Sequence, residues 1–334
     1  MHRSGLVVFS LIASAYPVAA GLYPGITATN HTCALSEPVL SCSDQAVPGE
    51  VDTCCVETFG GLILQTQFWS VFTGLESEGQ LLPANDWTIH GLWPDFCNGS
   101  FTQYCDLSRQ YDPKPAPNTT DGTPTGTPVP PYTGPSIESL FAEYGKGDLL
   151  AYMNKYWINQ FDKNWLLWAH EFSKHATCFS TFQKECFAFQ GPKASEFDDL
   201  FYFFETVIGY YKVHPTWGWL SAADIRPSNT TSYSFSDIQA ALTTGYGVTP
   251  FIGCGGPRFN ETEAGKGSLD NGGTQLNEMW YYYHVFGGAQ RQQGVRLPAD
   301  VAAGSVTTCA KAPGAIWYYE RAPGSEAGSE TGDC

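Results

Sequence analysis

Apolar residues follow two different spacings along the chain, which predict a fold that mixes helices and strands. The clearest helical pattern spans residues 195–213, where apolar side chains recur near a helical period. Short apolar runs bounded by turn residues favour strands instead. We therefore expect a single-domain α+β fold in which helices flank an antiparallel sheet. The expected helices are 136–157, 164–179, 195–213 and a short one ending near Gly245, and the expected strands are 61–69, 87–90 with a turn at Gly91, 249–253, 279–286 and 315–320.

Capping residues and glycines refine two of these helices. Ser136 is the expected N-cap of the helix 136–157, which Gly145 and Gly147 interrupt. Ser236 stands three residues before Gln239, and this spacing is typical of a capping box.

The first twenty residues resemble a signal peptide. A short basic start precedes an apolar run at 6–15, and small residues follow at 18–20. This run is too short for a permanent membrane anchor, and no later segment has 18 consecutive apolar residues. We therefore expect a protein that is secreted or held in a vacuole or lysosome-like compartment, with no membrane span. The mature domain is expected at 21–320, followed by a flexible tail at 321–334.

Eleven cysteines, all after the signal segment, agree with an oxidising compartment. They predict five disulfides and one unpaired residue, for which the terminal Cys334 is the natural candidate. The absence of a Cys-x-x-Cys pair argues against a zinc ribbon. Five glycosylation sequons also suit an exported surface, at Asn30, Asn98, Asn118, Asn229 and Asn260.

The net charge of −16 excludes one class of nucleic-acid binder. A protein that holds polyanions on a broad basic surface needs an excess of lysine and arginine. The acidic balance still allows a small cationic pocket, and it suits an acidic working medium.

Residues 112–135 are rich in Pro, Thr and Gly, which predicts an exposed insertion within the domain. Cysteines on either side of this segment are expected to pair across it.

Two segments, 87–97 and 170–178, carry the residues suited to catalysis. Together they hold three of the seven histidines, and each ends in a cysteine. In a helical second segment, Glu171, Lys174 and His175 stand at i, i+3 and i+4 and share one face. A disulfide beside each segment would hold its histidine at the distances that proton transfer needs.

Two imidazoles without a metal ion suit the cleavage of RNA, because the substrate's own 2′-hydroxyl is the nucleophile. One histidine removes the 2′-hydroxyl proton and the other protonates the leaving 5′-oxygen, and the ordinary pKa of histidine, about 6.5, makes both forms accessible. Lys174 and a protonated His170 can stabilise the developing charge. A zinc-protease motif needs histidines at i and i+4, whereas His170 and His175 stand at i and i+5 with a lysine between them. We therefore expect no metal and no other cofactor.

Each of these residues also has an ordinary structural interpretation. His90 and Trp93 could simply pack in the core, and Asp95 could cap a turn. Glu171 and Lys174 could form a surface ion pair. At the level of function, a secreted binding protein on the same fold and a secreted zinc hydrolase remain as alternatives to a nuclease.

The two segments together resemble the active-site segments of the T2 ribonucleases, especially the secreted fungal members. The pattern His-Gly-Leu-Trp-Pro-Asp stands at 90–95, and His-Glu-x-x-Lys-His-x-Thr-Cys stands at 170–178. The Cys54-Cys55 doublet is similar too. The sequence departs from the family pattern at Phe172, where Trp is common, and at Ala176, where Gly is common.

This resemblance implies a role for each matching residue. His175 would be the general base and His90 the general acid, while Glu171 and Lys174 support the transition state and His170 holds the phosphate. The substrate-binding residues would be Trp93, Asp95, Phe101 and Gln67, with Phe101 standing where some fungal members place a base-stacking Tyr. The resemblance also implies the disulfides Cys33–Cys55, Cys42–Cys97, Cys54–Cys186, Cys105–Cys178 and Cys254–Cys309.

The resulting functional prediction is a secreted, monomeric endoribonuclease with an acidic pH optimum and low base specificity. It would cleave single-stranded RNA through a 2′,3′-cyclic phosphate to 3′-phosphate products.

Overall fold

The computed structural model of the chain describes residues 33–187, 196–260, 269–290, 294–300 and 306–328. The expected signal peptide, the sequon at Asn30 and Cys334 lie outside these residues. Within them, the asparagines of the other four sequons are all exposed, and no helix is long and apolar enough to cross a membrane.

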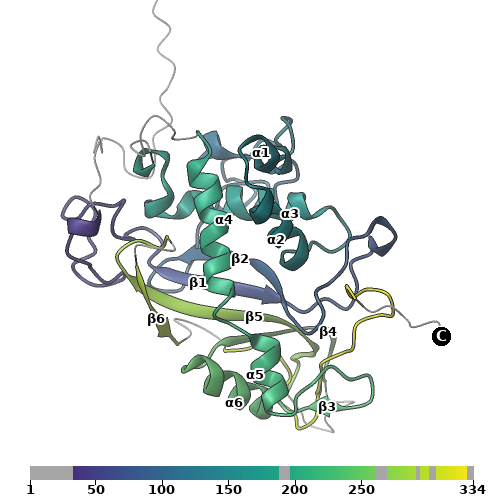
Figure 1. The fold of residues 1–334 in the computed structure, drawn as a ribbon. Coiled ribbons are helices and arrows are strands. Elements are labelled where there is room, and N and C mark those ends of the chain that lie inside the picture. Colours follow the sequence, from purple (N-terminus) through teal and green to yellow (C-terminus); the bar gives the residue numbers. More distant parts are fainter. Residues whose placement is uncertain (1–32, 188–195, 261–268, 291–293, 301–305, 329–334) are drawn as a thin grey trace, which may run out of the picture.

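The described elements are six α-helices and seven strands, with short 3₁₀ turns between them (Figure 1). The helices are α1 (Ile137–Glu143), α2 (Gly147–Tyr156), α3 (Asn164–Lys174), α4 (Asp198–Tyr211), α5 (Thr216–Ala222) and α6 (Phe235–Tyr246). The strands are β1 (Leu62–Phe68), β2 (Thr88–Asp95), β3 (Ser232–Tyr233), β4 (Phe251–Arg258), β5 (Gly273–Phe286), β6 (Val295–Ala299) and β7 (Ile316–Trp317).

The 14-residue strand β5 organises the sheet, because β1, β4, β6 and β7 all pair with it. β2 pairs only with β1 and therefore lies at an edge. The pairs β1–β2, β1–β5, β4–β5, β5–β6 and β3–β7 are antiparallel, whereas β7 meets β5 in parallel, so the sheet is mixed rather than purely antiparallel.

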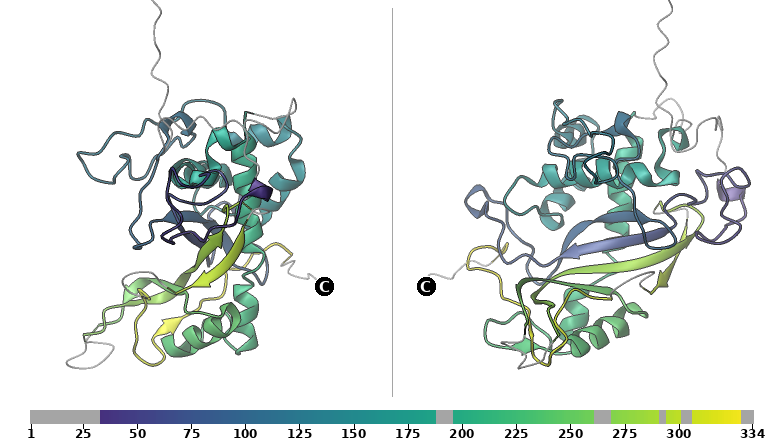
Figure 2. Two further views of the ribbon diagram at one scale, coloured as in Figure 1. Left: turned by 90° about the vertical axis from the view of Figure 1, so that its left-hand side faces the viewer. Right: turned by 180° about the vertical axis from the view of Figure 1, so that it is seen from behind.

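The sheet has one face under helices and one face without them. Helices α4, α5 and α6 lie on the same side of the sheet (Figures 1 and 2), where their aromatic and aliphatic side chains form the main core with Ile63, Ile89 and Tyr281. The opposite face carries a smaller apolar cluster around Leu64 and Phe251. Because side chains alternate along a strand, each strand contributes to both faces.

Several elements differ from the sequence predictions for identifiable reasons. The strand expected at 87–90 does not turn at Gly91 but continues to Asp95, because β1 pairs with it throughout. The helix expected at 164–179 ends at Lys174, whose carbonyl accepts the amide of Tyr104 instead. The N-cap of α6 is Ser234, two residues before the predicted cap at Ser236. The strand expected at 315–320 is only two residues long, and α5, β3 and β6 were not predicted.

The described part of the expected tail, residues 321–328, makes several contacts with the rest of the domain. Arg321 donates hydrogen bonds to the carbonyls of Ser70, Pro83 and Asp86 and pairs with Glu326. Backbone bonds also join this segment to Val71 and Leu82. Residues 329–334 lie outside the described part of the chain.

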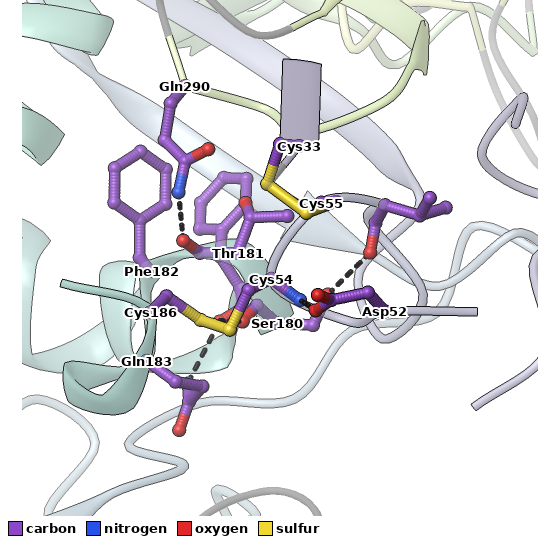
Figure 3. Close-up of a disulfide and its surroundings, with 12 residues drawn as sticks. Cys33, Asp52, Cys54, Cys55, Ser180, Thr181, Phe182, Gln183, Cys186 and Gln290 are labelled. Carbon is purple, nitrogen blue, oxygen red and sulfur yellow. Dashed lines mark hydrogen bonds between the residues drawn. A yellow bond between two sulfur atoms is a disulfide. The ribbon is translucent and has the colours of Figure 1, made fainter. Parts of the chain in front are cut away.

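The structure contains the five disulfides that the resemblance implies. Figure 3 shows two of them side by side, where the adjacent Cys54 and Cys55 reach Cys186 and Cys33. The bond to Cys186 holds the N-terminal loops against the 3₁₀ turns that follow α3. Cys105–Cys178 encloses the Pro/Thr-rich insertion, as expected, and ends within four residues of Lys174.

Candidate active site

A β-bulge in β2 places the first histidine. Thr66 of β1 pairs with Gly91 and Gln67 pairs with Ile89, so His90 is the extra residue between them. In a regular strand, residues 90 and 93 would point to opposite faces, because they are an odd number apart. The bulge resets the alternation, and His90, Trp93 and Asp95 all border one cavity.

Glu171 joins the two segments. This carboxylate is fully buried, and its Oε2 accepts the Trp93 indole N–H at 2.8 Å. Its Oε1 lies 3.5 Å from His90 Nε2. A Cβ at Gly91 would lie 1.8 Å from Glu171 Oε2, so only glycine lets α3 approach β2 this closely.

The second histidine, His175, lies just past the end of α3 rather than within it. A 3₁₀ turn follows at Ala176–Cys178, and Thr177 fixes this turn by donating to Ser173 O at 2.8 Å. The His175 ring stacks on Trp93, with ring centroids 4.9 Å apart and planes inclined at 17°. Trp93 therefore contacts both imidazoles, because its ring also meets His90 edge-on at 4.7 Å.

The electrostatic environment makes His175 the neutral imidazole of the group. Burial lowers its pKa well below the usual value, and the cationic forms of Lys174, His170 and His90 lower it further. Among the described residues, neither of its ring nitrogens has a hydrogen-bond partner. Burial also lowers the pKa of Lys174, which Glu171 and Asp112 partly offset.

Two carboxylates that the sequence analysis did not identify contact the other two histidines. Glu278 of β5 lies 2.9 Å from His90 Nδ1, and Asp112 lies 2.8 Å from His170 Nδ1. Neither belongs to a recognisable motif, and only the spatial proximity of distant segments reveals them.

A cavity of about 390 Å³ opens beside the three histidines, a size typical of small-ligand sites. Trp93 and the largely exposed Phe101 line it, as predicted for base-binding residues. Asp95 also lines it, and burial raises the pKa of this carboxyl to about 7. The remaining wall is aromatic and was not predicted, and it comprises Phe251, Trp280 and Tyr282.

A second cavity, of about 580 Å³, shares His90 and His170 with the first. It extends along the end of β1 and the loop that follows, including Phe68, and reaches the 158–161 segment between α2 and α3. The two imidazoles therefore stand where two cavities meet.

Gln67, predicted to bind substrate, lines neither of these two cavities. Its side chain is fully buried. The amide donates to Gln65 Oε1 and His214 O, and its oxygen accepts the Thr216 hydroxyl at 2.6 Å. Gln67 lies on the sheet face opposite the site and joins β1 to the segment between α4 and α5.

One group of described residues has the spacing of metal ligands. Ligand atoms of His170, Glu171 and His175 all lie within 4.8 Å of one another. The ammonium group of Lys174 acts on His175 from the same turn and opposes the binding of a second cation there. The arrangement is better suited to an anion that contacts the lysine and a protonated imidazole.

Residues 60–293 match the model of the ribonuclease T2 family. Ribonuclease Le2 of Lentinula edodes is 37% identical over 250 residues, which cover 74% of this chain and 82% of that protein. Ribonuclease Trv of Hypocrea rufa is 34% identical over 289 residues, which cover 86% and 98%. A ribonuclease T2-like protein of Aspergillus fumigatus is 34% identical over 277 residues, and this chain spans 55% of its length.

The solved structures agree with this assignment. Actibind, a T2 ribonuclease, matches with a TM-score of 0.63 and 28% identity, over 85% of this chain and 96% of the Actibind chain. The family model covers both histidine segments, and the relatives align over most of the chain. The protein therefore belongs to the ribonuclease T2 family and is a T2-type ribonuclease.

Proposed function

We propose that this ribonuclease cleaves single-stranded RNA without a metal ion, by attack of the 2′-hydroxyl on the adjacent phosphorus. His175 accepts the 2′-hydroxyl proton, and His90 donates a proton to the leaving 5′-oxygen. The first product carries a 2′,3′-cyclic phosphate, which water then opens to a 3′-phosphate. DNA lacks the nucleophile and is not a substrate.

The observation that carries the proposal is that His90 and His175 contact the same Trp93 ring but lie in different electrostatic environments. His175 is buried among cations and stays neutral at acidic pH, as a general base must. His90, on the edge of the same Trp93 ring, faces Glu171 and Glu278. These two carboxylates orient its ring, as a general acid that must reach the leaving oxygen requires.

Charge that develops on the phosphorane is stabilised by the group beside His175. Lys174 and His170 line the same cavity as the two catalytic imidazoles, and we place the scissile phosphate against them. Glu171 holds Trp93 with one oxygen and faces His90 with the other, and so keeps the acid oriented. Such preorganised groups act strongly because the site is partly closed to water.

The two cavities support internal cleavage of a single strand. A base on the 5′ side of the scissile bond fits between the aromatic walls at Trp93 and Phe101, and the next nucleotide fits the second cavity. Stacking on these rings is tolerant of base identity, so base specificity is low. A paired base cannot enter such a pocket, which favours single strands.

Digestion of each homopolymeric RNA, with and without EDTA, tests the proposal. Equal rates in both conditions and products with 2′,3′-cyclic ends are expected. Loss of activity on chelation, or 5′-phosphate products, would overturn the mechanism. A large preference for one homopolymer would overturn low base specificity alone.

We also propose export and action as a monomer. The five disulfides and the signal-like first twenty residues support an oxidising destination. Expression in a eukaryotic host should release a monomeric protein into the medium with a new N-terminus near residue 21. Retention of the full-length chain in the cytosol would contradict export.

A further inference from the structure

The geometry assigns positioning roles to Glu278 and Asp112, two carboxylates outside both histidine segments. Each accepts the Nδ1–H of an active-site imidazole, so that its Nε2 is the nitrogen presented to the scissile phosphate. Glu278 serves His90 and Asp112 serves His170. This inference rests on the proposed function, in which His90 is the acid and His170 holds the phosphate.

Glu278 and Phe68 together restrict the His90 ring. Glu278 Oε1 lies 2.9 Å from His90 Nδ1, and the Phe68 ring stacks on the imidazole at 3.7 Å. Phe68 and Glu278 face each other across the β1–β5 register, so one strand pair supplies both contacts. An ionised carboxylate can only accept hydrogen bonds. It therefore selects the Nδ1–H tautomer and leaves Nε2 to exchange the proton with the substrate.

Asp112 holds His170 in the same way from a different part of the chain. Its side chain is 2% exposed, and Oδ2 lies 2.8 Å from His170 Nδ1. Oδ2 also accepts the Tyr104 hydroxyl at 3.2 Å, while Oδ1 accepts the Lys114 amide at 2.7 Å. Asp112 is the first residue of the Pro/Thr-rich insertion, so the start of that segment helps to build the site. Because two other donors already fix this carboxylate, it loses little freedom when it holds the imidazole.

His175 provides the contrast within the same site. It has no carboxylate partner among the described residues, and its neighbours Lys174, His170 and His90 disfavour its protonation. The two imidazoles that must carry a proton thus have an anionic partner at Nδ1, whereas the imidazole that must accept a proton has none. This asymmetry divides the roles of three otherwise similar side chains.

Leaving-group chemistry tests the assignment of Glu278. An alkoxide leaving group, as in a dinucleoside monophosphate, needs a proton from the acid, whereas p-nitrophenolate leaves without one. Glu278→Gln keeps the side-chain shape but adds an N–H₂ group that can force the other tautomer. We expect kcat/KM for the dinucleotide to fall about 10–100-fold, the usual scale for the partner of a functional histidine. The value for uridine 3′-(p-nitrophenyl phosphate) should change less than about twofold, because the acid is not needed there.

Asp112→Asn should behave differently, because it acts through the phosphate ligand. Both substrates carry the same phosphate, so both should lose kcat/KM to a similar extent, mainly through a higher KM. Asp121→Asn is the matched control, since Asp121 is an exposed carboxylate of the same insertion whose hydrogen bonds, among the described residues, are to Thr123. For Glu278 the control is Glu205→Gln, which removes a surface ion pair with Lys146. Neither control substitution should change kcat/KM for either substrate.

His90→Ala distinguishes the role of His90 as the acid from the positioning role of Glu278. If this substitution lowers kcat/KM for both substrates equally, the assignment of His90 as the acid fails. A second outcome is that His90→Ala leaves kcat/KM for the aryl substrate unchanged, which supports His90 as the acid. If Glu278→Gln then lowers kcat/KM for both substrates equally, or for neither, the positioning role of Glu278 is overturned. An Asp112→Asn variant that matches the wild type on both substrates overturns the role of Asp112.

A measurement on the unmodified protein covers the case in which a variant does not fold. Ring ¹⁵N shifts of neutral His90 and His170 should report Nδ1–H tautomers. Observation of Nε2–H tautomers at these two residues would overturn the proposal without any substitution.

Discussion

The carboxyl of Asp95 should give the protein a pH-dependent stability that a single substitution removes. Burial against the aromatic cavity raises its pKa from 3.8 to about 7, and no described residue donates a hydrogen bond or ion pair to offset the cost. The folded state therefore binds this proton more tightly than the unfolded chain does. The stabilisation is complete below about pH 4 and is lost as the pH rises through 7.

The size of the effect follows from the shift. Three pKa units correspond to about 4 kcal/mol of differential stability, at about 1.4 kcal/mol per unit. Because the side chain borders an open cavity that admits water, solvent screening reduces this, and we expect about 1–2 kcal/mol. Asp95→Asn keeps the shape, removes the titration and breaks no hydrogen bond of the described residues.

Urea unfolding at pH 4, 6 and 8, followed by tryptophan fluorescence with the disulfides intact, measures this difference. The free energies of unfolding of variant and wild type should agree within about 0.5 kcal/mol at pH 4. At pH 8 the variant should be more stable by about 1–2 kcal/mol, while other titrating groups cancel in the comparison. A difference that stays constant from pH 4 to 8 would refute the reasoning.

Four further predictions concern the catalytic segments and their support. The lowered pKa of His175 should place the rising limb of the kcat/KM profile well below pH 6.5, and a limb centred at or above that value would exclude it as the base. Glu171→Gln should lower kcat on homopolymeric RNA by about 100-fold, because an amide cannot support the protonated acid, and a loss under threefold would remove it from the mechanism. Replacing Cys105 and Cys178 by alanine should lower the free energy of unfolding in urea by about 2–5 kcal/mol, and an unchanged midpoint would contradict this. Arg109→Met leaves the buried carboxylate of Asp199 without its ion-pair partner and should lower the free energy of unfolding by about 3–5 kcal/mol in the same assay. A loss below about 1 kcal/mol would show that the Arg109–Asp199 pair is dispensable.

The candidate catalytic groups could be found from the sequence because their chemistry is local. Two short segments hold His90, His175 and their neighbours at spacings that few other functions require, and the resemblance they carry also implied the pairing of ten cysteines. The helix at 195–213 could be predicted from its period, since burial of one face leaves that period in the sequence, and the strand at 61–69 from its short apolar run.

The tertiary structure decided which residues meet. A regular strand would have separated His90 from Trp93, and only the register against β1 creates the bulge that brings them to one face. The same pairing turned Gln67 to the helix-covered face, away from the candidate active site. Glu278 and Asp112 stand 188 and 58 residues from the histidines they contact, and no periodicity or motif spans such distances.

Some features could be predicted from the sequence and others could not, because the interactions that create them span different distances along the chain. Alternation and helical period record which face of an element is buried, and this is fixed within a few residues. Bulges, docked termini such as 321–328 and carboxylate partners depend on the packing of elements that lie far apart in the chain. The sequence by itself therefore determined which candidate acid–base groups this protein carries, and the folded chain determined how each imidazole is held.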